Sequence, residues 1–172
     1  MKRKIITGII IIVCFLLQTT VFDNLSFAGI KPNLMIIVIA TFGFMRGKKS
    51  GMFVGFLCGL LIDTSIGSIL GFHIIIYTLI GYVNGFFKRI FFDDDITLPI
   101  ALITASNLIY GIVVYILMFM LNSYFDFGYY LLHIIIPELI YTLIITLVIY
   151  QIILRINKML EAEEQRSASR FV

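Results

Sequence analysis

One carboxylate interrupts a regular series of glycines. Gly51, Gly55 and Gly59 are spaced four residues apart, and the next position of that series is Asp63, inside the run GMFVGFLCGLLIDTSIGSILG. An aspartate near the centre of a bilayer costs roughly 2.5–3.5 kcal/mol, so Asp63 needs a partner or a position near the membrane surface. Three roles are open to it: a cap on the next helix across a tight turn, a hydrogen bond between helices, or membership of a functional site.

Three further polar residues lie within apolar runs: His73, Asn107 and Glu138. Pro137 removes a backbone hydrogen bond just before Glu138, so we expect a kink that turns Glu138 towards neighbouring helices. Asn107 and Glu138 could pair with each other. The alternative is that each makes an internal contact without chemistry, although an ionisable residue at such depth is by default a functional hypothesis.

The known catalytic arrangements of membrane enzymes are missing from this sequence. An aspartyl protease needs two apposed aspartates, and Asp63 is the only one inside an expected span. No HExxH zinc motif or phosphate-binding glycine loop occurs, and Ser106 with His73 or His133 has no supporting motif. We therefore predict a protein that is not an enzyme and that carries no metal and no cofactor.

The composition is that of an integral membrane protein. Of the 172 residues, 60% are hydrophobic and 13% are charged, and the mean hydropathy is +1.06, against about 45–50% apolar and about 25% charged in soluble domains. The net charge of +3 does not imply nucleic acid, because the basic residues follow the expected membrane topology. Cys14 and Cys58 lie in apolar runs without a CxxC motif and are expected to be buried thiols.

The apolar runs predict an all-α bundle of six transmembrane helices. The first run follows basic residues as in a signal peptide, but it is long and lacks a cleavage site, so we expect a retained helix. Residues 1–154 form the predicted membrane domain, and residues 155–172 form a short tail that is either solvated or a docking element. The expected helices are 5–22, 33–45, 51–67, 69–87, 97–121 and 129–154.

The basic residues set the predicted orientation. In a six-span chain only Lys31 of the 13 basic residues lies on one side, and cytoplasmic connections are the ones enriched in Lys and Arg. We therefore expect a multi-pass protein of the plasma membrane with both termini in the cytoplasm. The residues on the cytoplasmic side would be Lys2, Arg3, Lys4, Arg46, Lys48, Lys49, Lys88, Arg89, Arg155, Lys158, Arg166 and Arg170.

The glycine spacing predicts close packing of two helices. Residues four apart share one face of a helix, and small residues on such a face let a neighbouring backbone approach. Gly81 and Gly85 repeat the spacing on the following helix, so we expect a tight hairpin. Gly67 and Gly71 are expected in the turn between the two helices and at the start of the second.

Residues 31 to 85 carry motifs that resemble the rod shape-determining protein MreD family. The family has a Pro-Asp-Leu-like helix start, a basic-Gly turn, a Gly-Phe-x-x-Gly-Leu-Leu-x-Asp run, a Leu-Gly pair and a later helix with Tyr and paired glycines. Asn33 stands where the family often has an acid. The matching residues here are Pro32, Asn33 and Leu34; Arg46 and Gly47; Gly55, Phe56, Gly59, Leu60, Leu61 and Asp63; Leu70 and Gly71; and Gly81, Tyr82 and Gly85.

The resemblance implies a non-enzymatic component of the bacterial cell-elongation complex. Similar proteins bind the single-span protein MreC and act with the actin-like MreB, the glycosyltransferase RodA and a class B penicillin-binding protein in lateral-wall peptidoglycan synthesis. The family fold is similar to that of the substrate-binding subunits of energy-coupling-factor transporters. That likeness implies a rival function, capture of a vitamin-type small molecule.

The residues favour a scaffold over a capture subunit. A scaffold would use Gly51, Gly55, Gly59 and Asp63 to form or brace a face for a partner helix, in contact with membrane lipid. A capture subunit would place a pocket near the outer face among Asp63, His73 and Asn107. Such a pocket would be expected to contain tryptophan, and the chain has none.

Overall fold

The computed structural model describes residues 2–25, 29–65, 70–90, 96–120 and 127–168, and helices make up almost all of these ranges. The all-helical fold class predicted from the sequence is confirmed. Short π-helical turns, Leu17–Val21, Tyr115–Met120 and Leu131–Ile135, join helices into longer rods, and the 3-10 helix Gly85–Ile90 extends α5. The α-helices are α1 Lys2–Leu16, α2 Phe22–Asn24, α3 Leu34–Arg46, α4 Lys48–Ser65, α5 Phe72–Asn84, α6 Thr97–Val114, α7 Phe127–Tyr130 and α8 Ile136–Ala168.

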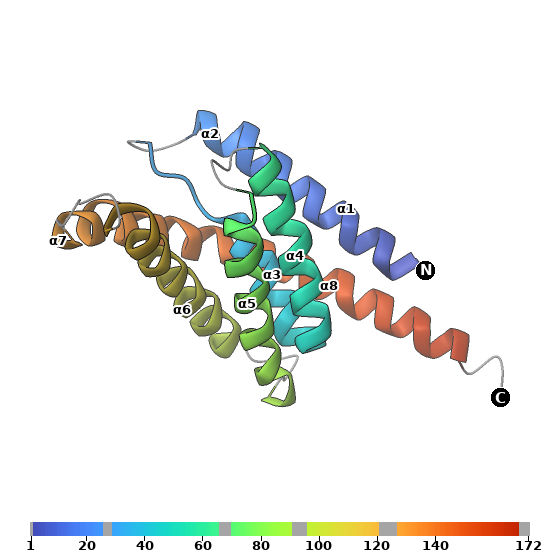
Figure 1. Cartoon of the computed structure of the whole chain (residues 1–172). Coiled ribbons are helices and arrows are strands. Elements are labelled where there is room, and N and C mark those ends of the chain that lie inside the picture. Colours follow the sequence, from blue (N-terminus) through green and yellow to red (C-terminus); the bar gives the residue numbers. More distant parts are fainter. Residues whose placement is uncertain (1, 26–28, 66–69, 91–95, 121–126, 169–172) are drawn as a thin grey trace.

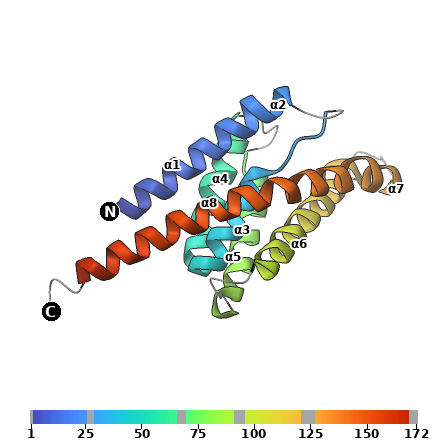
Figure 2. The same cartoon turned by 180° about the vertical axis from the view of Figure 1, so that it is seen from behind.

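Helix α3 is the core of the molecule. It lies at the centre of both views in Figures 1 and 2, and it contacts α1, α4, α5, α6 and α8. Every residue from 34 to 45 is buried. The sequence LMIIVIATFGFM is apolar nearly all round, which suits a helix surrounded by either protein or lipid, and here protein covers it. The other helices therefore form a shell around α3.

The start of α3 is held by side chains from distant helices. The Asn33 side chain caps the helix by accepting from the Ile36 N–H at 3.3 Å. The Asn33 N–H donates to Thr142 Oγ1 of α8 at 3.0 Å, and the Met35 N–H donates to Gln18 Oε1 at 3.2 Å. A helix of 13 residues is about 20 Å long, shorter than the roughly 30 Å hydrocarbon core. Side chains of other helices thus satisfy the backbone N–H groups at its start, as non-helical backbone within a membrane would require.

Helices α3 and α4 meet at a single glycine. Arg46 ends α3, Lys48 begins α4, and Gly47 between them has φ +91°. Residues with a Cβ rarely adopt this conformation, so the sharp turn depends on glycine. The predicted basic-Gly pair therefore marks the point at which the chain leaves the core and starts the hairpin of α4 and α5.

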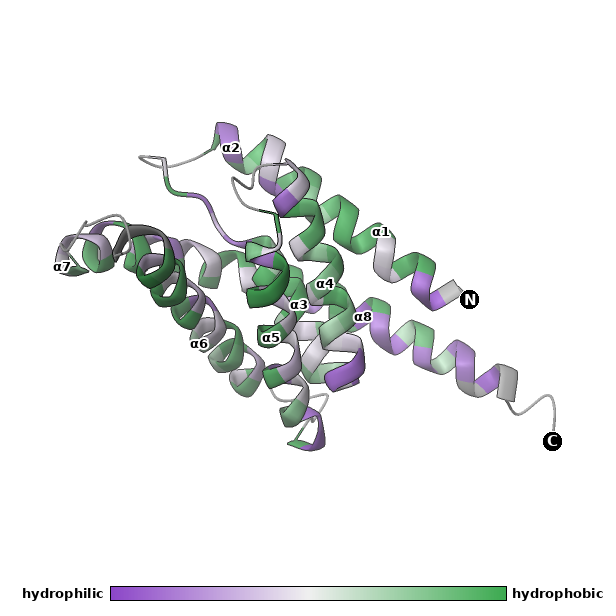
Figure 3. Cartoon of the chain, in the orientation of Figure 1, coloured by the Kyte–Doolittle hydropathy of each residue, from purple (hydrophilic) through white to green (hydrophobic). Residues whose placement is uncertain are grey.

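Three of the described helices are long and apolar enough to cross a membrane. They are Arg3–Asn24, Thr97–Leu117 and Phe127–Glu164, while Leu34–Arg46 is apolar but shorter. Figure 3 shows the apolar residues along these rods and the hydrophilic ones at the start of α1, the start of α4 and the last part of α8. The six-span count stays a prediction for the remaining helices.

Basic residues from four segments gather at one end of the molecule. The start of α1 and the end of α8 lie on the same side in Figures 1 and 2, and Arg3 pairs with Glu164 at 2.7 Å. Arg3 and Lys4 line one cavity together with Arg46 and Lys49. Lys48 lies 3.3 Å from the centre of the Phe86 ring, so the 3-10 helix after α5 lies beside the start of α4. Lys31 belongs instead with Asp23 at the far end of the first rod, at 2.6 Å.

Helix α8 continues beyond the predicted end of the membrane domain. The boundary expected between residues 154 and 155 falls inside this helix, which runs without a break to Ala168. Asn157 and Leu160 in the predicted tail are buried. Cys14 and Cys58 are free and buried, in line with their apolar surroundings.

Candidate functional site

The glycine stripe lies in the interface between α4 and α5. A Cβ at Gly51 would overlap the carbonyl oxygen of Gly81, and a Cβ at Gly81 would overlap the carbonyl oxygen of Gly51. One turn along, a Cβ at Gly55 would meet the carbonyl oxygen of Tyr77. The obstructing atoms are backbone, so they cannot move aside as a flexible side chain would. Contact of two backbones at this distance is available only to glycine.

The seam extends in both directions from these pairs. A Cβ at Gly59 would collide with the backbone of Ile74, and a Cβ at Gly85 would collide with the backbone of Lys48. Gly43 of α3 faces the same place, with a Cβ there 2.8 Å from the carbonyl oxygen of Gly81. The predicted stripe is thus filled by the chain's own α5 along its length, and it presents no open face to a partner helix. Gly67 lies outside the described residues.

Asp63 caps the start of α5 from the end of α4. Its Oδ2 accepts from the N–H groups of Gly71 at 2.9 Å and Ile74 at 3.2 Å, and its Oδ1 accepts from the His73 N–H at 3.1 Å. Its Oδ1 also lies 2.8 Å from His73 Nδ1. A carboxylate is favoured there because the first N–H groups of a helix have no partner within the helix. Two of the roles considered for Asp63 were a cap on the next helix and a hydrogen bond between helices. The same contacts fill both roles, because the capped helix α5 is the neighbour of α4.

Gly71 makes this geometry possible. Its φ is +99°, in the left-handed region, immediately before the first residue of α5. This conformation turns its N–H towards Asp63, and glycine adopts it without steric cost. The position expected for Gly71 at the start of the second hairpin helix is the one observed.

A row of aromatic rings leads from this cap to the start of α3. The His73 ring lies 5.8 Å from the Tyr77 ring and 6.3 Å from the Tyr110 ring, and the two tyrosine rings are 5.4 Å apart. The Tyr77 hydroxyl donates to Asn33 Oδ1 at 3.5 Å. Asn33 is in turn bonded to Thr142. Buried polar groups therefore connect α4, α5, α3 and α8 at one level of the bundle.

A cavity of about 480 Å³ opens beside Asn33. Glu138, His133, Lys31 and Gln18 line it together with apolar and aromatic residues. Asp63, His73 and Asn107, the three residues expected to line a capture pocket, do not line this cavity.

Asn107 and Glu138 do not form the pair considered from the sequence. Asn107 is buried in α6, where its Oδ1 has no hydrogen-bond partner among the described residues, and Glu138 lines the cavity near Asn33. Ser106, next to Asn107, accepts from Asn84 Nδ2 at 2.8 Å. The polar residues of α6 and α8 are therefore distributed over separate contacts.

Arg46 links the end of α3 to the last part of α8. Its Nε and Nη2 donate to Asn157 Oδ1 at 2.8 Å and 2.7 Å, and its Nη2 lies 3.6 Å from Glu161 Oε1. The bidentate contact uses the planar guanidinium geometry, which a lysine lacks. This gives the arginine of the basic-Gly pair a structural role.

Sequence reasoning missed the residues that join distant helices. Thr142, Tyr77 and Asn157 each bond across the fold. The available signal was weak: Thr142 and Asn157 are polar residues in or beside an apolar run, and nothing in the spacing indicates their partners.

The sequence also matches a family model. The model of the rod shape-determining protein MreD matches residues 2–160. The chain belongs to the MreD family. This membership agrees with the motif residues identified in the sequence, and it indicates a membrane protein with a role in rod-shape determination. The match also covers α8 through Leu160, which includes Asn157.

The other comparisons add no relative. No curated protein and no solved structure matches the chain significantly. The expected likeness of this MreD-family fold to the substrate-binding subunits of energy-coupling-factor transporters therefore has no support.

The MreD motif residues occupy the turning points of the fold. Pro32, Asn33 and Leu34 start α3, and Arg46 and Gly47 end it. The later motif glycines form the seam and Asp63 caps it, whereas four motif side chains are exposed: Phe56, Leu60, Leu70 and Tyr82. In this chain the family pattern is thus used to build and hold the three central helices.

Proposed function

We propose that this chain is a non-enzymatic membrane scaffold of the bacterial cell-elongation complex that binds an MreC-like single-span protein. Through that partner it acts with MreB, RodA and a class B penicillin-binding protein to direct lateral-wall peptidoglycan synthesis. The observation that carries the proposal is the match of the MreD family model over residues 2–160.

The use of the polar residues supports a scaffold. Asp63, Asn33 and Arg46 each bond to backbone or side-chain groups of another helix. Such contacts fix the relative positions of the helices. They also occupy these polar groups with hydrogen bonds inside the bundle. A stiff bundle with apolar outer faces suits the docking of a partner's single helix.

We further propose six membrane-crossing rods with both termini in the cytoplasm. Basic residues from the start of α1 and from the α3–α4 turn lie together at one end, beside the end of α8. This arrangement supports the topology, because cytoplasmic segments are the ones rich in Lys and Arg. Single cysteines at positions 31 and 49, in a chain with Cys14 and Cys58 replaced by Ala, test it. Only position 31 should react with an impermeant maleimide in intact spheroplasts, and labelling of position 49 there contradicts the topology.

The partner proposal is tested by depletion and cross-linking. Loss of the chain from its rod-shaped host should give round cells, and the tagged chain should co-purify the MreC-like protein. Photo-cross-linking residues at Phe56, Leu79 and Ile144 probe the exposed faces of α4, α5 and α8. We expect cross-links to the partner on one of these faces. Retention of rod shape after depletion, or absence of the partner from every sample, overturns the proposal.

A further inference from the structure

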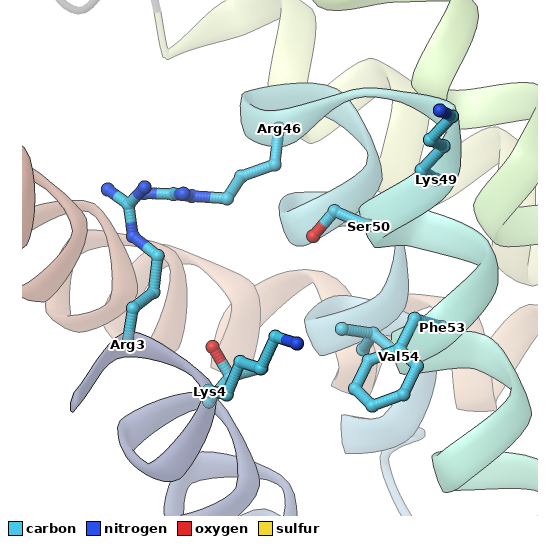
Figure 4. Close-up of a pocket in the computed structure, with 8 residues that line it drawn as sticks. Arg3, Lys4, Arg46, Lys49, Ser50, Phe53 and Val54 are labelled. Carbon is cyan, nitrogen blue, oxygen red and sulfur yellow. The ribbon is translucent and has the colours of Figure 1, made fainter. Parts of the chain in front are cut away.

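Four cations from three segments surround one cavity at the basic end of the molecule. The cavity has a volume of about 390 Å³ and is lined by Arg3 and Lys4 of α1, Arg46 at the end of α3 and Lys49 in the first turn of α4. Figure 4 shows the side chains of Arg3 and Arg46 extending towards each other from α1 and from the end of α3. Thr7, Ser50, Phe53 and Val54 complete the lining. Like charges gathered around a cavity favour an anion inside it.

The carboxylates of the described chain neutralise only part of the positive charge around the cavity, and two N–H donors of Arg3 have no acceptor. Arg3 pairs with Glu164 through Nη1 alone, while its Nε and Nη2 are buried and have no hydrogen-bond partner in the described part of the chain. Arg46 donates through Nε and Nη2 to the uncharged Asn157 side chain, and it reaches the Glu161 carboxylate only at 3.6 Å, so its charge is weakly paired. No ion pair between a described carboxylate and Lys4 or Lys49 is formed. Buried donors without an acceptor are costly, and an anion with several oxygens would satisfy them.

The cavity also has an apolar side that continues along α4. Phe53 and Val54 line it, and Phe53 is 53% exposed. Phe56 and Leu60 follow on α4 and are also exposed. A ligand with an anionic head and a long apolar chain fits both parts, whereas a small soluble anion would use only the cations. Basic pockets between membrane helices bind anionic lipid head groups in this way.

We propose that this cavity binds the phosphate of an anionic phospholipid. Arg3 donates to the phosphate oxygens through its Nε and Nη2, and Arg46 does so through its Nη1, because its other two nitrogens hold Asn157. Lys4 and Lys49 supply further positive charge, and an acyl chain lies along Phe53. The lipid would join α1 to the ends of α3 and α4. The lipid proposal does not need the partner, since its test uses the purified chain alone. Its acyl chain shares with the partner proposal only the α4 face that Phe56 probes, and it does not use the faces of α5 and α8.

Lipid binding by the purified full-length chain tests the site. Phosphatidylglycerol and phosphatidylcholine are titrated in detergent, with native mass spectrometry and thermal unfolding as readouts. We expect phosphatidylglycerol, and not phosphatidylcholine, to bind and to raise the unfolding temperature. The paired substitutions Lys4→Gln and Lys49→Gln should weaken phosphatidylglycerol binding roughly 30-fold. These lysines lack internal ion pairs, so the folded bundle should persist.

The matched control removes two cations from the same end that do not line the cavity. Arg89→Gln with Arg155→Gln should leave phosphatidylglycerol binding close to that of the unmodified chain. An equal loss in this control would mean a diffuse surface charge effect and overturns the proposal. Millimolar inorganic phosphate serves as the second control. If it raises the unfolding temperature as much as phosphatidylglycerol does, the ligand is a free anion and the lipid site is overturned. Arg3→Gln with Arg46→Gln should weaken lipid binding at least as much as the lysine pair.

Discussion

At the scale of single residues, Asp63 shows how a charged group is kept inside an apolar bundle. Its side chain has no exposed surface, yet it accepts three backbone N–H groups and contacts the His73 ring. Those donors would otherwise be unsatisfied at the start of α5. The carboxylate therefore closes the hairpin at the end opposite Gly85.

Substitution of Asp63 separates the need for an acceptor from the need for a charge. Asp63→Ala should lower the free energy of unfolding by about 2 kcal/mol, because several buried donors lose their acceptor. Asp63→Asn keeps one acceptor oxygen and should cost less. Thermal unfolding in detergent measures both, with Asp23→Ala, which breaks the exposed pair with Lys31, as the control. An unfolding temperature for Asp63→Ala equal to that of the control would contradict the capping role.

At the scale of elements, the helices pack in two ways. Helices α4 and α5 pack backbone against backbone, whereas α3 is held mainly by the side chains of the helices around it. The hairpin depends on the absence of side chains at Gly51, Gly55 and Gly81. Helix α3 depends instead on being covered by long apolar side chains and on the bonds that hold its first turn. These two kinds of packing predict different responses to substitution.

A bulky residue in the glycine seam should separate the hairpin. Gly55→Leu places a side chain where the Tyr77 carbonyl lies, and we expect a loss of about 3 kcal/mol or more, at the upper end of what overpacking costs. Phe56→Leu, on the adjacent outward-facing position, should be nearly neutral. Thermal unfolding of the two variants, together with their ability to restore rod shape in depleted cells, measures the difference. Equal behaviour would show that the seam tolerates side chains.

The first turn of α3 should depend on one hydroxyl of α8. Thr142→Val removes the acceptor of the Asn33 N–H while nearly keeping the side-chain shape. We expect a loss of roughly 1–3 kcal/mol from the unsatisfied buried donor. Thr146→Val is the control, since the Thr146 hydroxyl bonds only to a carbonyl of its own helix. Hydrogen exchange at the Asn33 amide should rise in Thr142→Val alone, and unchanged exchange would refute the bond's role.

At the scale of the whole molecule, the last part of α8 joins the shell to the core. Asn157 and Glu161 hold Arg46 of α3, and Glu164 holds Arg3 of α1. This part of the predicted tail therefore packs on the bundle: Asn157 and Leu160 are buried, while the Glu161 and Glu164 side chains are about half exposed. It also positions two of the four cations that line the basic cavity.

Truncation of this segment should loosen α1 and α3 together. A chain ending at residue 156 loses Asn157, Glu161 and Glu164, whereas a chain ending at residue 164 keeps all three. We expect the shorter chain to unfold at a lower temperature and to exchange amide hydrogens faster near Arg3 and Arg46. The chain that ends at residue 164 should resemble the full chain in both measurements. Identical exchange in both truncated chains would argue against the docking role.

The properties that the sequence determined by itself are local or periodic. The membrane class follows from composition, the positions of the helices follow from apolar runs, and the close hairpin follows from glycines at a spacing of four residues. A cap on the next helix could be named as one of three roles for Asp63, because the residue and the helix start belong to one short connection. In each case the interacting residues lie near one another in the chain, so their spacing carries the information.

Only the tertiary structure decided which helix occupies the centre and how distant polar residues pair. An apolar helix looks much the same in sequence whether lipid or protein surrounds it, so the burial of α3 on all sides was not predictable from its residues alone. Asn33 finds Thr142, and Arg46 finds Asn157, across more than a hundred residues. The tight glycine hairpin was predictable, but the fold had to show that α5 covers the α4 stripe from Gly51 to Gly59 and leaves none of it to a partner helix. Long-range pairing depends on how helices are arranged around one another, and no spacing within a single helix records that arrangement.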